Sequence, residues 1–151
     1  RNYSPFLEEF MTDGAEMVFF LQGAHSMTCR HAVRHLRSQG VKVGMVRLRF
    51  LRPWPTDDVA NVLSKFKAVG VIETNTSYGG ATRGGSLLHE VRASLYDCPQ
   101  RPLTTSFMAG LGGEMVPLRE FYYMAEVMSK MMKEGKTKKN VYWVNHEFDE
   151  A

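Results

Sequence analysis

Residues 15–22 read AEMVFFLQ, and this apolar stretch decides the fold class. Its apolar residues follow one another too closely for a strand with one face in water, so we predict a strand buried on both sides. Gly23 ends the stretch. Residues 26–38 then carry Met27, Ala32, Val33 and Leu36 at helical spacing, with Ser26 as a candidate N-cap. A buried strand followed by an amphipathic helix is the repeating unit of a parallel sheet.

The same alternation extends along the rest of the chain. Further strands are predicted at residues 42–50, 68–73 and 103–108, and further helices at 56–66, 86–96 and 117–133. Residues 3–11 should form a short leading helix. With right-handed crossovers, these elements form a single three-layer α/β domain: a mostly parallel sheet with helices on both faces. We assign this domain to residues 1–134 and expect residues 135–151 to be a tail or a short extra strand.

Composition narrows the class of protein. The chain has 151 residues, 44% of them hydrophobic and 23% charged, which suits one globular domain. A net charge of +3 without a clustered basic stripe argues against a nucleic-acid partner, and no apolar run is long enough for a membrane helix. Cys29 and Cys98 form no metal-binding spacing, and we expect a cytoplasmic location. Because Arg1 begins the sequence, we expect an excised piece of a longer protein.

Two glycine-rich loops are candidate anion sites. The first contains Gly79, Gly80 and Arg83, and the second is Gly110-Leu111-Gly112-Gly113. Neither matches G-x-G-x-x-G, and neither is followed by the Gly-Lys-Ser/Thr of a P-loop. We therefore interpret both loops as tight turns between strands and helices. Arg83 remains free to pair with an anion or with a carboxylate of a neighbouring domain.

Glu73 and Asn75 stand at the end of a predicted strand, where α/β proteins place their sites. A catalytic acid needs a partner and a pocket, and the sequence supplies neither. We therefore expect Glu73 to contact the following loop or another domain.

His31 and His35 lie four residues apart on a helix, but neighbouring arginines would repel a cation. The sequence thus predicts no catalytic, cofactor-binding or metal-binding residue.

The last predicted long helix is rich in methionine. Met124, Met128, Met131 and Met132 form an apolar stripe along it. Methionine packs adaptably against irregular partners. We interpret the stripe as core or as part of a subunit interface.

Three segments together resemble a known family. They are KVGMVRLRFLRPWP at residues 42–55, AVGVIETN at residues 68–75, and AGLGG at residues 109–113. The series resembles domain II of pyruvate:ferredoxin oxidoreductase and related 2-oxoacid:acceptor oxidoreductases, a domain similar in fold to the C-terminal domain of transketolase. The most specific element is Arg49-x-x-Arg52-Pro53-Trp54-Pro55, in which family members usually have Phe in place of Trp54.

The resemblance implies a non-catalytic structural and interaction domain. The whole enzyme would oxidatively decarboxylate a 2-oxoacid such as pyruvate to acyl-CoA and reduce ferredoxin or flavodoxin. Thiamine diphosphate, Mg²⁺ and iron–sulfur clusters would be bound by other domains. This chain would pack against the thiamine-binding domains or subunits and help to build an oligomer. The residues to which the resemblance gives structural or interface roles are Arg49, Arg52, Pro53, Trp54, Pro55, Glu73, Asn75, Gly79, Gly80, Arg83, Gly110, Leu111, Gly112 and Gly113.

Two alternatives stay open at the level of sequence. One is the C-terminal domain of another transketolase-like enzyme, such as a 2-oxoacid dehydrogenase β subunit, in which a Pro-hydrophobic-Asp turn replaces Pro53-Trp54-Pro55. The other is a free-standing anion-binding domain that uses Arg83 and the two glycine loops.

Overall fold

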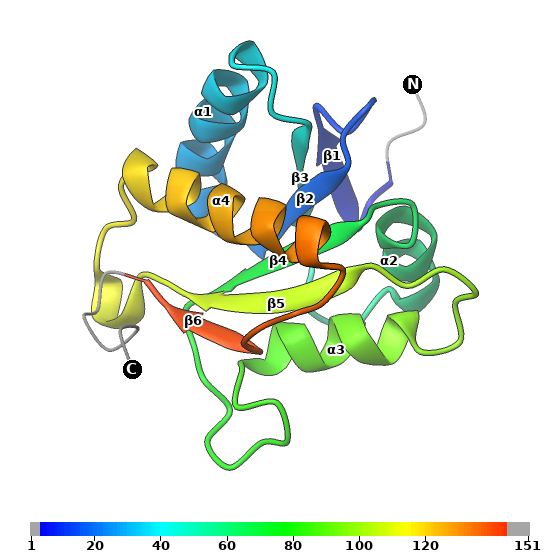
Figure 1. The fold of residues 1–151 in the computed structure, drawn as a ribbon. Helices are drawn as coiled ribbons and strands as arrows, with labels where there is room; N and C mark the ends of the chain where they lie inside the picture. The colour runs from blue at the N-terminus through cyan, green and yellow to red at the C-terminus, as the bar shows by residue number, and fades with distance from the viewer. Residues whose placement is uncertain (1–3, 145–151) are drawn as a thin grey trace.

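A computed structural model describes residues 4–144 and shows a six-stranded sheet between two pairs of helices (Figure 1). The strands are β1 (Leu7–Phe10), β2 (Met17–Gln22), β3 (Val43–Leu48), β4 (Ala68–Glu73), β5 (Leu103–Met108) and β6 (Val141–Trp143). The helices are α1 (His25–Ser38), α2 (Thr56–Leu63), α3 (Ser86–Leu95) and α4 (Leu118–Glu134), with a 3₁₀ turn at Leu111–Gly113. The predicted three-layer α/β architecture is confirmed.

The strand order is β1-β3-β2-β4-β5-β6. Strands β2 to β6 run parallel, and only β1 is antiparallel to its neighbour β3. Strand β2 leads through α1 to β3 on one side, whereas its neighbour β4 leads through α3 to β5 on the other. Adjacent strands whose connections diverge in this way leave a crevice at their carboxyl ends. The topology therefore locates the candidate site between the ends of β2 and β4.

The helices cover the two faces of the sheet in pairs (Figure 1). Helices α1 and α4 bury one face, where the rings of Phe19 and Phe121 meet edge to face with centroids 5.8 Å apart. Helices α2 and α3 bury the other, where Phe20 meets Trp54 at 6.3 Å. Each face thus has its own hydrophobic core.

The last crossover has the opposite hand to the other three. Helices α1 and α4 lie on the same face, yet α1 leads toward the β1 edge and α4 leads toward the β6 edge. Helices α2 and α3 lie on the other face and lead in the direction opposite to α1, so they share its hand. Since nearly all such crossovers are right-handed, β5-α4-β6 is the left-handed exception. The sequence left residues 135–151 as a tail or a short extra strand and predicted no crossover there, so this connection adds to the predicted topology.

The predicted leading helix is also wrong. Tyr3 lies outside the described residues, and residues 7–10 form β1, paired in register with β3 from Leu7↔Leu48 to Phe10↔Met45. The sequence LEEF suits a helix locally, but the exposed edge of β3 offers unpaired backbone groups and a place to bury Leu7. Tertiary pairing overrides local propensity here.

Two predicted helix starts need correction. Helix α1 begins at His25 with Ala24 before it, and the Ser26 hydroxyl donates to the carbonyl of Gly23 at 2.8 Å instead of capping the helix. Met27, which the spacing placed on the apolar face, is 61% exposed. Cys29 is buried on that face instead. Likewise, α4 begins at Leu118, one residue after the predicted start at residue 117.

The methionine stripe of α4 belongs to the core. Met124, Met128 and Met131 are buried against the sheet, and Met132 packs at the margin of the same cluster.

Between residues 4 and 144, no helix has the length and apolar character needed to cross a membrane.

Candidate functional site

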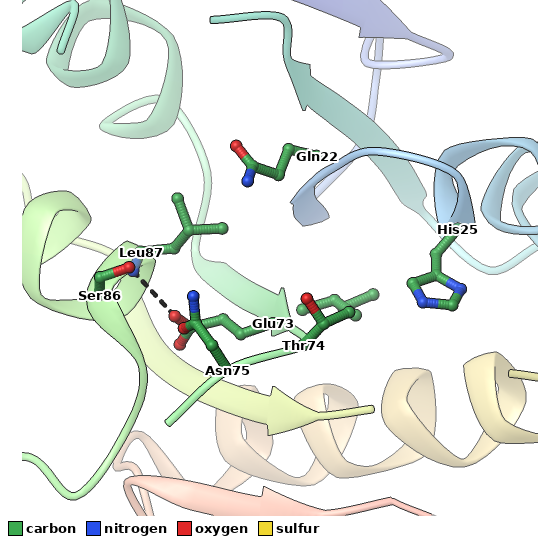
Figure 2. A pocket seen from close by; sticks show the side chains of 8 residues that line it. Gln22, His25, Glu73, Thr74, Asn75, Ser86 and Leu87 are labelled. Atoms are coloured by element: carbon green, nitrogen blue, oxygen red, sulfur yellow. Dashed lines mark hydrogen bonds between the residues drawn. The ribbon is translucent and has the colours of Figure 1, made fainter. Parts of the chain in front are cut away.

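A small pocket lies where the topology locates a site. It lies at the carboxyl ends of β2 and β4 and at the start of α3 (Figure 2). Gln22, His25, Glu73, Thr74, Asn75, Ser86 and Leu87 line it together with Ile72. The position follows from the diverging connections of β2 and β4.

Glu73 is the best-connected side chain of the pocket and is only 3% exposed. Its Oε1 accepts hydrogen bonds from the Ser106 hydroxyl at 2.7 Å and from the backbone N–H of Gly85 at 3.1 Å. Its Oε2 accepts one from the backbone N–H of Leu87 at 2.8 Å (Figure 2). The carboxylate therefore ties β4 to β5 and to the amino end of α3, whose first N–H groups have no partner within the helix.

Burial raises the pKa of Glu73, and the hydrogen bonds from Ser106, Leu87 and Gly85 partly oppose that rise. A raised pKa with a pocket nearby is a mark of some catalytic acids. Here, however, three internal donors already occupy the carboxylate, so its geometry is that of a structural tie. The sequence predicted a contact with the following loop, and the structure places Glu73 against the end of that loop.

Gly85 is a site residue that sequence reasoning missed. An added Cβ would overlap Glu73 Oε2 and the carbonyl oxygen of Asn75, and would lie 2.7 Å from Asn75 Oδ1. Only glycine lets the backbone come this close to the carboxylate. Its position at the end of a glycine-rich loop and directly before a predicted helix was the available signal.

His25 is a second missed residue, and it brings the other glycine loop to the site. An added Cβ on Gly110 would overlap the His25 imidazole and would lie 3.2 Å from the carbonyl oxygen of Glu114. Gly110 has a φ of 73°, so glycine is favoured there for conformation as well as for space. The position of His25, two residues after the Gly23 that ends a predicted strand, could have indicated it.

The Arg-x-x-Arg-Pro-Trp-Pro segment fixes the exit from β3. The Arg52–Pro53 peptide is cis. Trp54 Nε1 donates to the Ser94 hydroxyl at 2.8 Å, and Arg52 pairs with Glu90 at 2.6 Å, so the segment is held against α3. Pro55 is buried and directly precedes α2. Arg49 instead turns toward Glu8 on β1, at 3.8 Å.

The loop between β4 and α3 projects from the same end of the sheet. Its ends are joined by a hydrogen bond from the Ser77 N–H to the Gly84 carbonyl at 2.9 Å. Tyr78 is 93% exposed, Gly79 has a φ of 72°, and Arg83 adopts a left-handed φ of 58°. Arg83 lies at the boundary of two shallow hollows that it shares with Trp143 of β6. The structure therefore keeps the two glycine loops apart, one against His25 and one beside β6.

Exposed apolar side chains gather on this carboxyl edge. They lie in the segments that directly follow β2, β3, β4 and β5, and they are Met27, Phe50, Leu51, Tyr78, Met115 and Leu118. Large apolar groups exposed on several adjacent loops are typical of a surface that contacts another protein or domain.

The described residues contain no group of three or more His, Cys, Asp or Glu placed to hold a metal ion. Cys29 and Cys98 are both free thiols, and burial raises the pKa of Cys29 well above its ordinary value. The His35 ring lies against Tyr122, with centroids 5.1 Å apart. These groups contribute to packing.

Comparison with known proteins identifies the family. Residues 15–121 match the family of the pyruvate:ferredoxin oxidoreductase core domain II, and since this match covers most of the chain, the chain belongs to that family. The ketoisovalerate oxidoreductase subunit VorA of Pyrococcus furiosus is 33% identical over 143 residues, 95% of this chain and 36% of VorA. The pyruvate synthase subunit PorA of Pyrococcus abyssi is 29% identical over 138 residues, 91% of this chain and 34% of PorA.

The chain thus spans about a third of the length of these curated relatives. Among solved structures, a 2-oxoglutarate:ferredoxin oxidoreductase from Magnetococcus marinus matches with a TM-score of 0.62 and 21% identity, over 86% of this chain and 20% of that one. A split-gene transketolase matches with a TM-score of 0.52 and 20% identity, over 83% of this chain and 41% of that one. These structures share the fold, and the predicted likeness to the oxidoreductase and transketolase domains is confirmed.

Proposed function

We propose that this chain is a non-catalytic domain that packs, through the carboxyl edge of its sheet, against the thiamine-binding domains or subunits of a 2-oxoacid:ferredoxin oxidoreductase. The observation that carries the proposal is the set of exposed apolar side chains on that edge: Met27, Phe50, Leu51, Tyr78, Met115 and Leu118. Burying these side chains in a contact removes apolar surface from water, which stabilises the contact by about 25 cal/mol per Å² of buried apolar surface.

The activity belongs to the whole enzyme. It would oxidatively decarboxylate a 2-oxoacid, transfer the acyl group to coenzyme A and reduce ferredoxin or flavodoxin. Thiamine diphosphate, Mg²⁺ and iron–sulfur clusters would be bound by its other domains, and the enzyme would be a cytoplasmic oligomer. The relatives support this role because VorA is named as a subunit of a ketoisovalerate oxidoreductase and PorA as a subunit of a pyruvate synthase.

Within the chain, the carboxyl-edge residues have scaffold roles. Arg52, Pro53, Trp54 and Pro55 fix the strand exit, and Arg49 joins it to β1. Glu73 holds the loop that presents Asn75, Gly79, Gly80 and Arg83, while Gly110, Leu111, Gly112 and Gly113 turn the chain into α4. We place the domain at residues 1–134, with residues 135–151 as an appendage that adds β6 to the sheet.

Two tyrosines on opposite edges provide a matched test. Tyr78 is 93% exposed on the carboxyl edge, and Tyr96 is 72% exposed at the far end of α3. We expect Tyr78→Ser combined with Met115→Ser to reduce co-purification of the chain with the thiamine-binding part of the same oxidoreductase. Tyr96→Ser should leave it unchanged. Equal co-purification of both variants would contradict the proposal.

A second measurement tests the assignment of the cofactor to other domains. Isothermal titration of the chain with thiamine diphosphate and Mg²⁺ should show no binding. Tight, magnesium-dependent binding would place part of the cofactor site in this chain and overturn the non-catalytic role.

A further inference from the structure

Three arginines surround one carboxylate at the β1 corner of the sheet, and a fourth lies beside them over the Phe10 ring. Glu8 on β1 contacts Arg30 of α1 through Oε1, and its Oε2 lies 3.6 Å from Arg47 and 3.8 Å from Arg49. Arg34, one turn after Arg30, completes this arginine cluster, which we define as Arg30, Arg34, Arg47 and Arg49. The cluster carries four positive charges against the single negative charge of Glu8.

The hydrogen-bonding capacity of the cluster exceeds what Glu8 can accept. Arg47 Nε is buried and has no hydrogen-bond partner among the described residues. The distances of 3.6 and 3.8 Å from Glu8 to Arg47 and Arg49 are ion-pair distances, longer than a hydrogen bond. A buried donor without an acceptor is costly, so Glu8 alone leaves the guanidinium group of Arg47 incompletely paired.

The arginines are held in place before any ligand arrives. Strand pairing sets Glu8 directly opposite Arg47. The guanidinium groups of Arg30 and Arg34 lie 4.6 Å and 5.1 Å from the centroid of the Phe10 ring, which supports both side chains. A charged site whose donors are already positioned loses less side-chain entropy on binding.

The electrostatic environment favours an anion. Burial lowers the pKa of Arg30, and the nearby charges of Arg47, Arg34 and Arg49 lower it further. Mutual repulsion of this kind is relieved when another negative charge enters. The side chains of Arg47 and Arg49 are 36% and 39% exposed, so their outer sides are open to solvent.

We propose that the arginine cluster binds an oxyanion, a phosphoryl or carboxylate group, between Arg47 and Arg49 on the side away from Glu8. Guanidinium groups recognise both kinds of group through paired, charge-assisted hydrogen bonds. This site is separate from Arg83 and from the glycine loops of the carboxyl edge. It shares Arg49 with the scaffold of the carboxyl edge but does not require the exposed apolar side chains of the proposed docking surface.

The first test measures thermal stability of the chain in inorganic phosphate at constant ionic strength, with chloride as the replaced anion. A ligand that binds only the folded state raises the melting temperature as its concentration increases. We expect phosphate to raise it for the wild type and for Arg119→Gln, a control arginine on α4 that pairs with its neighbour Glu120. Arg47→Met should bind about tenfold more weakly, the loss expected for one charge-assisted hydrogen bond.

Further measurements keep the test valid if Arg47→Met does not fold. Arg49→Gln removes a more exposed charge and should weaken phosphate binding in the same direction. In the wild type, the ¹⁵N resonance of Arg47 Nε should move on titration, whereas that of Arg119 should not. Glu8→Gln removes the competing carboxylate and should tighten binding.

Acetate in place of phosphate distinguishes the two kinds of oxyanion. Stabilisation by phosphate alone would indicate a phosphoryl ligand, and stabilisation by acetate would indicate a carboxylate such as an acidic side chain. The proposal is overturned if neither anion stabilises the wild type, or if both act equally on Arg49→Gln and Arg119→Gln.

Discussion

The two edges of the sheet use carboxylates in opposite ways. At the amino edge, Glu16 is accessible to solvent and pairs with Lys42 at 3.0 Å and Lys67 at 3.3 Å. At the carboxyl edge, Glu73 is buried and accepts hydrogen bonds from backbone and hydroxyl donors, and it forms no ion pair with the described residues 4–144. Glu16 therefore pairs with lysines at a solvent-exposed edge, whereas Glu73 positions loops that project from the molecule.

The segments that connect the helices and strands also differ between the two edges. At the amino edge, neighbouring segments that lead into the strands are joined by close backbone contacts, such as the hydrogen bond from the N–H of Lys67 to the carbonyl of Glu16 at 2.8 Å. At the carboxyl edge, longer segments expose Phe50, Tyr78 and Met115. The difference supports the proposal that the carboxyl edge is the side of this domain that contacts other parts of the enzyme.

The largest expected effect is on Glu73. Glu73→Ala leaves the N–H groups of Gly85 and Leu87 and the Ser106 hydroxyl without their acceptor in a buried place. We expect a loss of about 3 kcal/mol in the free energy of unfolding. Urea unfolding measures it. Glu16→Ala on the exposed edge should cost clearly less, and an equal cost for both would remove the contrast between the edges.

The next largest effect on stability is expected for substitutions at two glycines, one at each edge. Gly85→Ala forces a Cβ against Glu73 and Asn75, and we expect a loss of about 2 kcal/mol. Gly14 at the amino edge has a φ of 67° with open space around it, so Gly14→Ala should cost only about 1 kcal/mol, from backbone strain. Thermal or urea unfolding of the two variants tests the order, and the reverse order would contradict the steric argument.

The pH dependence of stability should have opposite signs at the two edges. The pKa of Glu73 is raised above its ordinary value of 4.5, so its contribution is complete below 4.5 and is lost as pH rises through the raised pKa. Lys42 and Lys67 lower the pKa of Glu16, so its contribution is present above 4.5 and is lost as pH falls.

Urea unfolding between about pH 3 and about pH 7, a range that includes the ordinary carboxyl pKa of 4.5, measures both trends. Glu73→Gln should remove the loss on raising the pH. Glu16→Gln should remove the loss on lowering it, and added salt should weaken the Glu16 effect because that pair is exposed. A wild-type-like pH profile in Glu73→Gln would show that another group carries the trend.

The smallest expected effect on stability is at the loop tip. Tyr78→Ser should change the free energy of unfolding by less than about 0.5 kcal/mol, because the side chain is 93% exposed. The same variant should weaken docking to the thiamine-binding part. A large loss of stability would mean that Tyr78 supports its own loop instead.

Prediction from sequence succeeded where apolar runs were long and buried. The strand Ala68–Glu73 matches the predicted bounds, because residues buried on both faces of a sheet must be apolar almost throughout. The strand Leu103–Met108 also matches its predicted bounds, although Thr104, Thr105 and Ser106 are buried polar residues. It failed at residues 7–10, because pairing with a distant strand outweighed the local helical pattern. Of the candidate site, Glu73 could be found from its position at a strand end. The positions of Gly85 and His25 carried a signal, but their contacts could not be predicted, since those contacts join segments that are distant in the sequence.

The sequence by itself determined the alternation of buried strands and helices, the family resemblance and the positions of the glycine loops. These are local properties, since each follows from the hydrophobicity and backbone freedom of neighbouring residues. Only the tertiary structure decided that β1 pairs antiparallel with β3, that the last crossover is left-handed and that Glu73 joins three segments. It also brought Glu8 to Arg30 and Arg47, because charges distant in the sequence meet only when strands and helices pack.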